Sequence, residues 1–303
     1  PVKRGDCVTA IMGAISRFLI NLVLVLFSVA CLLPFVIVVS ASFSSEAALS
    51  AHGYTLFPRE ISLSAYEFIL SDTAVVLRSY GVSIVVTIVG TVLSMLVMSL
   101  MAYALSRKRF TLRQPIAFYI FFTMLFSGGL VPSYILITRY LQLRDTLWVL
   151  ILPGLVSGWN VLVLRTFFQD IPDELLDAAR IDGAGEWRTF FQIAIPLTTP
   201  GLATIGLFTM LAYWNDFYAA LLYIETSALY PIQYLLYVVL VRSEFLMKAQ
   251  QSQAATAGSA VTLIPVLPLR MAMAVLAMAP IAFGYLFVQK YFIRGIRLGS
   301  IKG

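Results

Sequence analysis

The chain has little charge, one histidine and two cysteines, and these shortages exclude several classes of protein. Only 12% of its 303 residues are Asp, Glu, Lys or Arg, whereas 60% are apolar and the mean hydropathy is +0.90. A soluble domain has about 25% charged residues and could not cover this much apolar surface, so a soluble enzyme is excluded. The single histidine, His52, leaves no His-based triad or HExxH metal site, and Cys7 and Cys31 make neither a disulfide framework nor a thiolate metal site.

A nucleotide-binding motif is also missing. A P-loop needs a lysine directly after a glycine, and none of the five lysines follows one. The formal net charge of +6 rests on 21 Lys and Arg residues, which are too sparse for a nucleic-acid surface. We therefore expect this chain to have no catalytic residue, no metal and no cofactor of its own, and to bind no nucleic acid.

Six apolar stretches dominate the sequence, and none of them contains Asp, Glu, Lys or Arg. Crossing the hydrocarbon core of a bilayer takes about 20 residues in a helix, and barrel strands would instead be about 10 residues of alternating polarity. The sequence therefore predicts an all-α integral membrane protein whose residues 1–303 form one transmembrane domain. The predicted spans are 18–41, 80–105, 115–138, 146–164, 193–215 and 271–288.

The distribution of basic residues predicts the orientation. Fourteen of the 21 Lys and Arg residues fall in 1–17, 106–114, 165–192 and 289–303, although the alternate segments are longer in total. The positive-inside rule then places these four segments, and both termini, in the cytoplasm. The apolar run 18–41 is longer than the 7–15 residues usual in a signal peptide, so we expect a retained first span.

Two outer segments contain further features. In 42–79, the stretch 63–70 is expected to form a short helix at the membrane interface. The segment 216–270 contains an apolar stretch that is too short to count as a span, followed by the polar run QQSQAATAGSA (250–260). We expect this run to be a flexible loop, either a passive connector or a contact for a solute-binding protein.

The cytoplasmic segment 165–192 differs from the other inside segments because it is long and acidic. Pro172, followed by Asp173 and Glu174, predicts a helix start, and Gly183 predicts its left-handed end. A second short helix is expected from Glu186 toward Pro196. Two interpretations remain open here: a segment lying on the membrane surface, or a docking site whose small side chains Ala178 and Ala179 admit another protein. A DNA-reading helix-turn-helix is excluded, because phosphate contacts need Lys and Arg.

The run DAARIDG, followed by nine residues and IAIP, resembles the cytoplasmic signature of importer-type ABC permeases, EAA-x3-G-x9-I-x-L-P. Asp177 stands for the glutamate and Ile195 for the leucine, and both replacements are conservative. The stretches FSGGLVPSYIL (126–136), WNDFYAAL (214–221) and QKYFIRGIRLGSIKG (289–303) resemble carbohydrate-importer permeases of the maltose-permease G type. They are more similar still to its branch for complex oligosaccharides and polysaccharide fragments, where an acidic cargo such as an alginate or pectin fragment is one option.

The resemblance implies a type I ABC importer permease fold in the bacterial cytoplasmic (inner) membrane. It implies a permease subunit that forms half of the path for an oligosaccharide delivered by an extracytoplasmic solute-binding protein. Its partners would be two ATPase subunits, which bind ATP and Mg, and a second permease that is related rather than identical. The residues implied in ATPase docking are Asp177, Ala178, Ala179, Asp182, Gly183, Ile193 and Pro196.

The C-terminal tail has two open interpretations. It can be a basic anchor on acidic membrane lipid, or, as the resemblance implies, it can reach between the ATPase subunits. The residues concerned are Arg297, Lys302 and Gly303.

The solute path is predicted from residue chemistry, because aromatic rings stack on sugar C–H faces and amides bond hydroxyls. Tyr and Trp at a span end can equally be membrane-interface residues. Glycines and prolines interrupt the third span (Gly128, Gly129, Pro132) and, with Asn160, the fourth (Pro153, Gly154, Gly158). They can produce kinks, close helix packing or cavity walls, and of these we expect close packing first at each. The predicted path residues are Asn160, Tyr213, Trp214, Asn215, Asp216 and Tyr218.

Two other classes of membrane protein predict different sequence features. A secondary transporter or channel for a small polar solute predicts intramembrane ionisable residues or internal repeats, and neither is found. An integral membrane enzyme predicts clustered His, Asp, Glu or Cys residues, against which a single histidine outside the spans argues.

Overall fold

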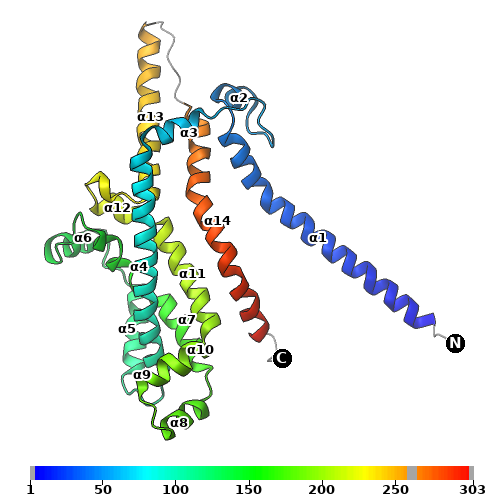
Figure 1. Ribbon diagram of the computed structural model, residues 1–303, viewed down its shortest axis with the longest axis vertical. Coiled ribbons are helices and arrows are strands. Elements are labelled where there is room, and N and C mark those ends of the chain that lie inside the picture. The colour runs from blue at the N-terminus through cyan, green and yellow to red at the C-terminus, as the bar shows by residue number, and fades with distance from the viewer. Residues whose placement is uncertain (1–3, 258–264, 300–303) are drawn as a thin grey trace. The chain divides into compact units, whose positions relative to one another are not determined.

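The computed structural model describes residues 4–257 and 265–299 (Figure 1). Apart from one antiparallel bridge between Ser44 and Ile61, the described residues form helices and their connections, which confirms the all-α prediction. The helices, in chain order, are α1 (Arg4–Ser42), α2 (Glu46–His52), α3 (Ser64–Ile69), η1 (Leu70–Asp72), α4 (Thr73–Ser106), α5 (Arg113–Leu125), α6 (Leu130–Ile135), η2 (Leu136–Tyr140), η3 (Leu147–Leu150), η4 (Leu152–Gly154), α7 (Gly158–Gln169), α8 (Asp173–Ile181), α9 (Glu186–Thr189), η5 (Phe190–Ala194), α10 (Ile195–Leu197), α11 (Thr199–Asn215), α12 (Tyr218–Tyr223), η6 (Ser227–Leu229), α13 (Ile232–Ala257) and α14 (Val266–Gly299).

Three helical stretches of the described chain are long and apolar enough to cross a membrane without a break. They are Ser16–Ser42, Ser64–Ser106 and Val266–Gly284, and they contain or overlap the predicted spans 18–41, 80–105 and 271–288. The short helix expected at 63–70 is present as α3, and it leads through η1 directly into α4.

The other three predicted spans are bent pairs of helices instead of straight rods. The bend is 112° between Arg113–Leu125 and Leu130–Tyr140, 53° between Leu147–Gly154 and Gly158–Gln169, and 83° between Glu186–Leu197 and Thr199–Asn215. The first two breaks contain or adjoin glycine, and the third lies between Pro196 and Pro200. Glycine permits unusual dihedral angles, and proline withdraws a backbone hydrogen bond. The interruptions expected in 115–138 and 146–164 are therefore present, whereas the bend within 193–215 was not predicted.

The chain divides into two compact units. The first comprises Pro1–Ser71 and Val239–Leu276. Within it, Tyr66 stacks on Phe43 with ring centroids 5.1 Å apart and shares a 2.9 Å hydrogen bond with the Ser42 hydroxyl. The carboxylate of Glu46 accepts a 2.9 Å hydrogen bond from the Leu267 N–H, which joins α2 to the start of α14.

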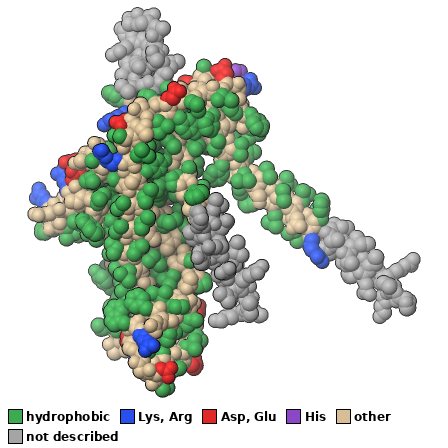
Figure 2. Space-filling view, in the orientation of Figure 1, with side chains coloured by type: hydrophobic (Ala, Val, Ile, Leu, Met, Phe, Trp, Pro, Cys, Tyr) green, Lys and Arg blue, Asp and Glu red, His purple; other side chains and the backbone are tan. Residues whose placement is uncertain are grey.

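The second unit, Asp72–Val238 with Ala277–Gly303, contains the features of functional interest. Helix α4 packs along α7 and α11, and α5 packs on α7; Figure 1 shows α8 and α9 at one end of this group. The buried face of α4 has small residues, among them Ser83, Gly90 and Ser94, that let neighbouring helices approach closely. Figure 2 shows hydrophobic side chains covering the visible flank of α4 and charged ones near α8.

Two further expectations need correction. The run 250–260 was expected to be a flexible loop, but α13 continues as a helix to Ala257, and 258–260 lie outside the described residues. Close packing was expected at Gly128 and Gly129, yet an added Cβ would meet nothing within 4 Å at either; Gly129 instead turns the chain with φ +85°. At Gly158 the packing expectation is confirmed, since a Cβ there would lie 2.9 Å from Met124.

Candidate docking segment and solute pocket

Helix α8 begins where the sequence predicts. Pro172 precedes it, and Asp173 and Glu174 lie in its first turn, where negative charge is favourable beside free N–H groups. Lys108 donates a 2.7 Å hydrogen bond to Asp173, and this bond with the lysine charge lowers the pKa of the Asp173 carboxyl. Leu176 and Ala179 are buried, so this face of α8 lies against the rest of the unit.

The end of α8 is a Schellman motif. Gly183 has φ +78°, its N–H donates to the Arg180 carbonyl at 3.0 Å, and the Ala184 N–H donates to the Ala179 carbonyl at 2.9 Å. A residue with a Cβ is strained in this left-handed conformation. The prediction that Gly183 ends the helix is confirmed.

The outward face of α8 presents an apolar side chain among small and acidic ones. Ile181 is 86% exposed, and Ala178 and Asp182 are exposed beside it. Of the other residues predicted for docking, Asp177, Gly183 and Pro196 are exposed, Ile193 is half-buried and Ala179 is buried. The segment is thus a short helix that ends in a Schellman motif and has an exposed face available to a partner.

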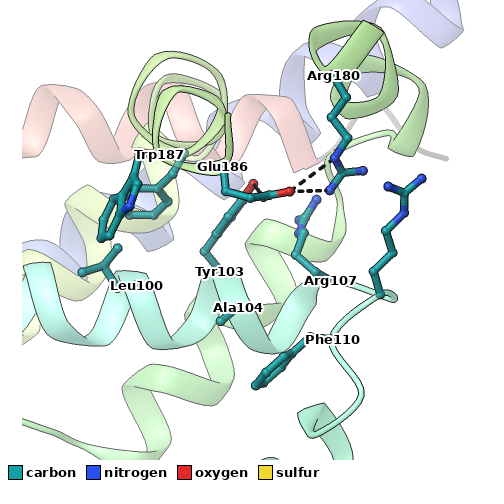
Figure 3. A pocket seen from close by; sticks show the side chains of 10 residues that line it. Leu100, Tyr103, Ala104, Arg107, Phe110, Arg180, Glu186 and Trp187 are labelled. Carbon is teal, nitrogen blue, oxygen red and sulfur yellow. Dashed lines mark hydrogen bonds and ion pairs between the residues drawn. The ribbon is translucent and has the colours of Figure 1, made fainter. Parts of the chain in front are cut away.

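Ionic hydrogen bonds join α8 and α9 to the ends of the longer helices (Figure 3). Arg180 donates to Asp177 at 2.9 Å and to the Glu186 carboxylate at 3.1 Å, and the Tyr103 hydroxyl of α4 donates to Glu186 at 3.3 Å. These bonds to Glu186 and Asp177 raise the pKa of Arg180. Arg180 and Glu186 thus link α8 to Tyr103 of α4.

Sequence reasoning missed this network. Asp177 pairs with Arg180 and lies 3.8 Å from Arg109. The three-residue spacing of Asp177 and Arg180 on a predicted helix was a usable signal. Tyr103 and Glu186 are 83 residues apart in the chain, and no local pattern joins them.

A pocket of about 380 Å³ lies beside this network and is called here the α4–α9 pocket. Its walls come from the last turns of α4, the residues that follow α4, the end of α8, and α9 with the start of η5. It is lined by Leu100, Tyr103, Ala104, Arg107, Arg109, Phe110, Arg180, Glu186, Trp187 and Phe190.

A second pocket, of about 230 Å³, is called the solute pocket, and it brings together three of the predicted path residues. Asn160, Tyr213 and Asp216 all line it, with Ser157 and Thr209, which sequence reasoning did not select. The Asn160 amide donates to the Thr209 hydroxyl at 3.5 Å. The pocket therefore presents amide, hydroxyl and carboxylate groups, the kinds that bond sugar hydroxyls.

The remaining path residues lie elsewhere. Trp214 is buried and donates its indole N–H to the Ala277 carbonyl at 3.1 Å, whereas Asn215 and Tyr218 are exposed. The Asp216 carboxylate also accepts hydrogen bonds from the Tyr218 and Ala219 N–H groups, at the start of α12, at 2.8 and 3.2 Å.

The predicted tail contacts are mostly outside the described part of the chain. Arg297 falls in α14, and Lys302 and Gly303 lie outside the described residues. In the parts searched, 4–257 and 265–299, no group of three His, Cys, Asp or Glu residues could hold a metal ion.

Residues 96–298 match the model of the family described as binding-protein-dependent transport system inner membrane components, and the chain belongs to this family. It is a multi-pass inner-membrane protein and the permease subunit of an ABC importer with the type I permease fold. It is not an enzyme, because the ATPase of such a system is a separate subunit. The family resemblance drawn from the signature residues is confirmed.

Two relatives in Bacillus subtilis (strain 168) are similar along most of their length. The chain is 41% identical over 280 residues to the polygalacturonan/rhamnogalacturonan transport system permease protein YtcP, covering 92% of this chain and 96% of the relative. It is 39% identical over 276 residues to protein LplC, covering 90% of each.

A solved structure is similar as well. A chain in the crystal structure of a bacterial ABC transporter involved in the import of the acidic polysaccharide alginate superposes with a TM-score of 0.73 at 29% identity. The match covers 96% of this chain and 99% of that one.

Proposed function

We propose that this chain forms half of the translocation path for an acidic oligosaccharide, delivered by an extracytoplasmic solute-binding protein. Two similarities support an acidic cargo: one relative is named for polygalacturonan and rhamnogalacturonan transport, and the similar solved chain belongs to an alginate importer. Asn160, Thr209 and Asp216 of the solute pocket would contact sugar hydroxyls on the way through.

The proposed assembly pairs this chain with a second, related permease and two ATPase subunits, which bind ATP and Mg. Residues 1–303 act in it as one transmembrane permease domain with six spans, each bent pair counting as one, and with both termini in the cytoplasm. The tail with Arg297, Lys302 and Gly303 reaches between the ATPase subunits.

One observation carries the docking proposal: α8 is exposed on one face, ends at Gly183, and is linked through Arg180 and through Glu186 of α9 to Tyr103 of α4. A helix of this kind moves as a rigid body. When the ATPase subunits close on ATP, a push on α8 passes through Arg180 and Glu186 to Tyr103, and the packed spans switch between two arrangements.

The test compares two neighbouring glycines that receive the same charge. Gly183 has φ +78°, but Gly185 has φ −70° and precedes α9 as its N-cap, where aspartate is favourable. Gly183→Asp should cost about 1 kcal/mol of local stability and abolish most ATP-driven uptake, while membrane insertion stays normal. Gly185→Asp should retain uptake and co-purify with the ATPase as the wild type does.

Four outcomes would contradict the proposal. Normal uptake with Gly183→Asp, or equal loss with both variants, would argue against docking through this turn. Failure of the wild-type chain to retain any co-expressed candidate ATPase would argue against the assembly. For the cargo, cells should accumulate labelled galacturonate oligomers in preference to neutral oligosaccharides of the same length, and equal accumulation would remove the acidic assignment.

A further inference from the structure

The α4–α9 pocket has two chemically different ends (Figure 3). Leu100 and Trp187 lie together at one end, and Arg107 and Arg180 lie toward the other, with Tyr103 and Glu186 between them. The lining is thus amphipathic: apolar and aromatic side chains on one side, guanidinium groups on the other. This arrangement is separate from the outward face of α8 that carries the proposed docking function.

The arginines of the pocket differ in how far their charge is compensated. Arg180 is held between the carboxylates of Asp177 and Glu186. Arg107 has no ion pair among the described residues; its Nη2 donates to the Phe168 carbonyl at 2.6 Å, and its guanidinium lies 4.8 Å from the centre of the Tyr103 ring. Arg109 approaches one carboxylate at 3.8 Å, and its side chain is 75% exposed. Arg107, whose Nε also donates to the Ser106 hydroxyl at 2.9 Å, has no carboxylate partner in the described part of the chain, and Arg109 has only a long, solvent-exposed ion pair with Asp177, so an anion can bind between the two.

The missing ion pair of Arg107 is important because its guanidinium group is partly buried. Burial lowers the pKa of Arg107, which means that its cationic form is less well solvated than in water. Arginine stays protonated all the same, so an anion beside it would gain a charge-assisted hydrogen bond.

The position of the pocket limits what that anion can be attached to. The predicted span 80–105 and the apolar stretch Ser64–Ser106 both end just before Arg107, so we expect the pocket at the boundary between the hydrocarbon and the aqueous phase. Trp187 is 67% exposed there, and exposed Trp is typical of membrane interfaces. A ligand can reach this site from the lipid headgroup layer.

We propose that the α4–α9 pocket binds an anionic phospholipid, with its phosphate between Arg107 and Arg109 and its glycerol and upper acyl chain against Leu100 and Trp187. Basic pockets at the ends of transmembrane helices bind acidic headgroups by this combination of charge and apolar contact. A free inorganic anion would leave the apolar end of the pocket unfilled. The bound lipid would lie next to Glu186 and would therefore stabilise the contact between α4 and α9.

The test is a lipid titration of the full chain, purified in detergent and followed by native mass spectrometry. The probes are phosphatidylglycerol and phosphatidylcholine with identical acyl chains. The wild type should retain phosphatidylglycerol in preference to phosphatidylcholine. Arg109→Gln should weaken phosphatidylglycerol binding about fivefold, and because this side chain is exposed the variant is expected to fold normally.

The matched control is Arg113→Gln, which removes the same charge four residues further on but outside the pocket lining. It should leave the preference for phosphatidylglycerol unchanged, and inorganic phosphate should not displace the lipid. Equal retention of the two lipids, or equal loss in both variants, would overturn the proposal. Displacement of the lipid by millimolar phosphate would also overturn it, in favour of a soluble anion.

Discussion

Tyr213 connects three helical segments of the second unit through a single side chain. Its hydroxyl lies 2.9 Å from the Ser94 hydroxyl of α4 and donates to the Ile151 carbonyl at 2.9 Å. Its ring packs against Gly90, where an added Cβ would lie 2.8 Å from a ring carbon. Because the same ring lines the solute pocket, the spacing of α4 and α11 fixes that wall of the pocket.

Gly90→Ala should therefore destabilise the protein. Overpacking a tight contact costs about 1–3 kcal/mol, and the better helix propensity of alanine returns about 1 kcal/mol of that. Gly81→Ala is the control, since it lies on the same helix and its Cβ would meet nothing within 4 Å. Thermal unfolding in detergent should give a lower midpoint for Gly90→Ala and an equal or higher one for Gly81→Ala. Equal midpoints for the two variants would refute the packing argument.

At the scale of the helices, the sequence predicted some elements well for identifiable reasons. Local signals set both ends of α8, since Pro172 and Gly183 act on the backbone next to them. The bends in the other spans depend on where each freed carbonyl finds a partner, and this is a property of the packed molecule. The bond between Tyr103 and Glu186 had no sequence signal for the same reason.

Another tertiary link joins the segment before η3 to the turn after α12. Asp145 has φ +57°, and its carboxylate accepts hydrogen bonds from the Glu225 and Thr226 N–H groups at 3.0 and 2.9 Å, and from the Thr226 hydroxyl at 2.6 Å. These bonds lower the pKa of Asp145 in the folded protein, and the bond from the Thr226 hydroxyl has the largest effect. The neighbouring Arg144 pairs with Glu225 and supports the same joint.

The pH dependence follows from the direction of that shift. Because the folded pKa lies below the unfolded value of about 3.9, the ionised Asp145 stabilises the fold fully above that value and loses its contribution as pH falls through the folded pKa. Asp145→Asn keeps a residue that tolerates a positive φ. Its thermal midpoint should be lower than that of the wild type at neutral pH, and the difference should shrink in acid.

The control for this prediction is Asp170→Asn, whose carboxylate has no hydrogen bond within the described part of the chain. It should change the midpoint little at any pH. A difference between Asp145→Asn and the wild type that persists unchanged through the acid range would show that the carboxylate charge is not the stabilising feature.

For the whole molecule, membership of the family establishes the class of transporter. The orientation of the chain in the membrane is the main prediction still to be tested. Ser16–Ser42 of α1 is long and apolar enough to cross a membrane. The sequence could predict that this helix exists, because hydropathy alone determines it. It could not predict what covers it.

Cysteine labelling tests the orientation directly. In a chain with Cys7 and Cys31 replaced by serine, a membrane-impermeant maleimide should label Phe57→Cys in intact spheroplasts and Ile181→Cys only after permeabilisation. Both side chains are well exposed, at 80% and 86%, so accessibility is not limited by the fold. Labelling of Ile181→Cys from outside would show that the predicted orientation is inverted, and α8 could then not bind a cytoplasmic ATPase.

The π-helical turn η5 affects how this part of the sequence should be interpreted. It lies between α9 and α10, and it accommodates one more residue than an ordinary α-helical turn would. A helical wheel drawn through 186–197 at 3.6 residues per turn would consequently rotate Pro196 by about 100° relative to Glu186. The nine positions between Gly183 and Ile193 overlap this widened turn, so a chain shortened there by one residue would be expected to re-form a regular helix and keep both ends in register.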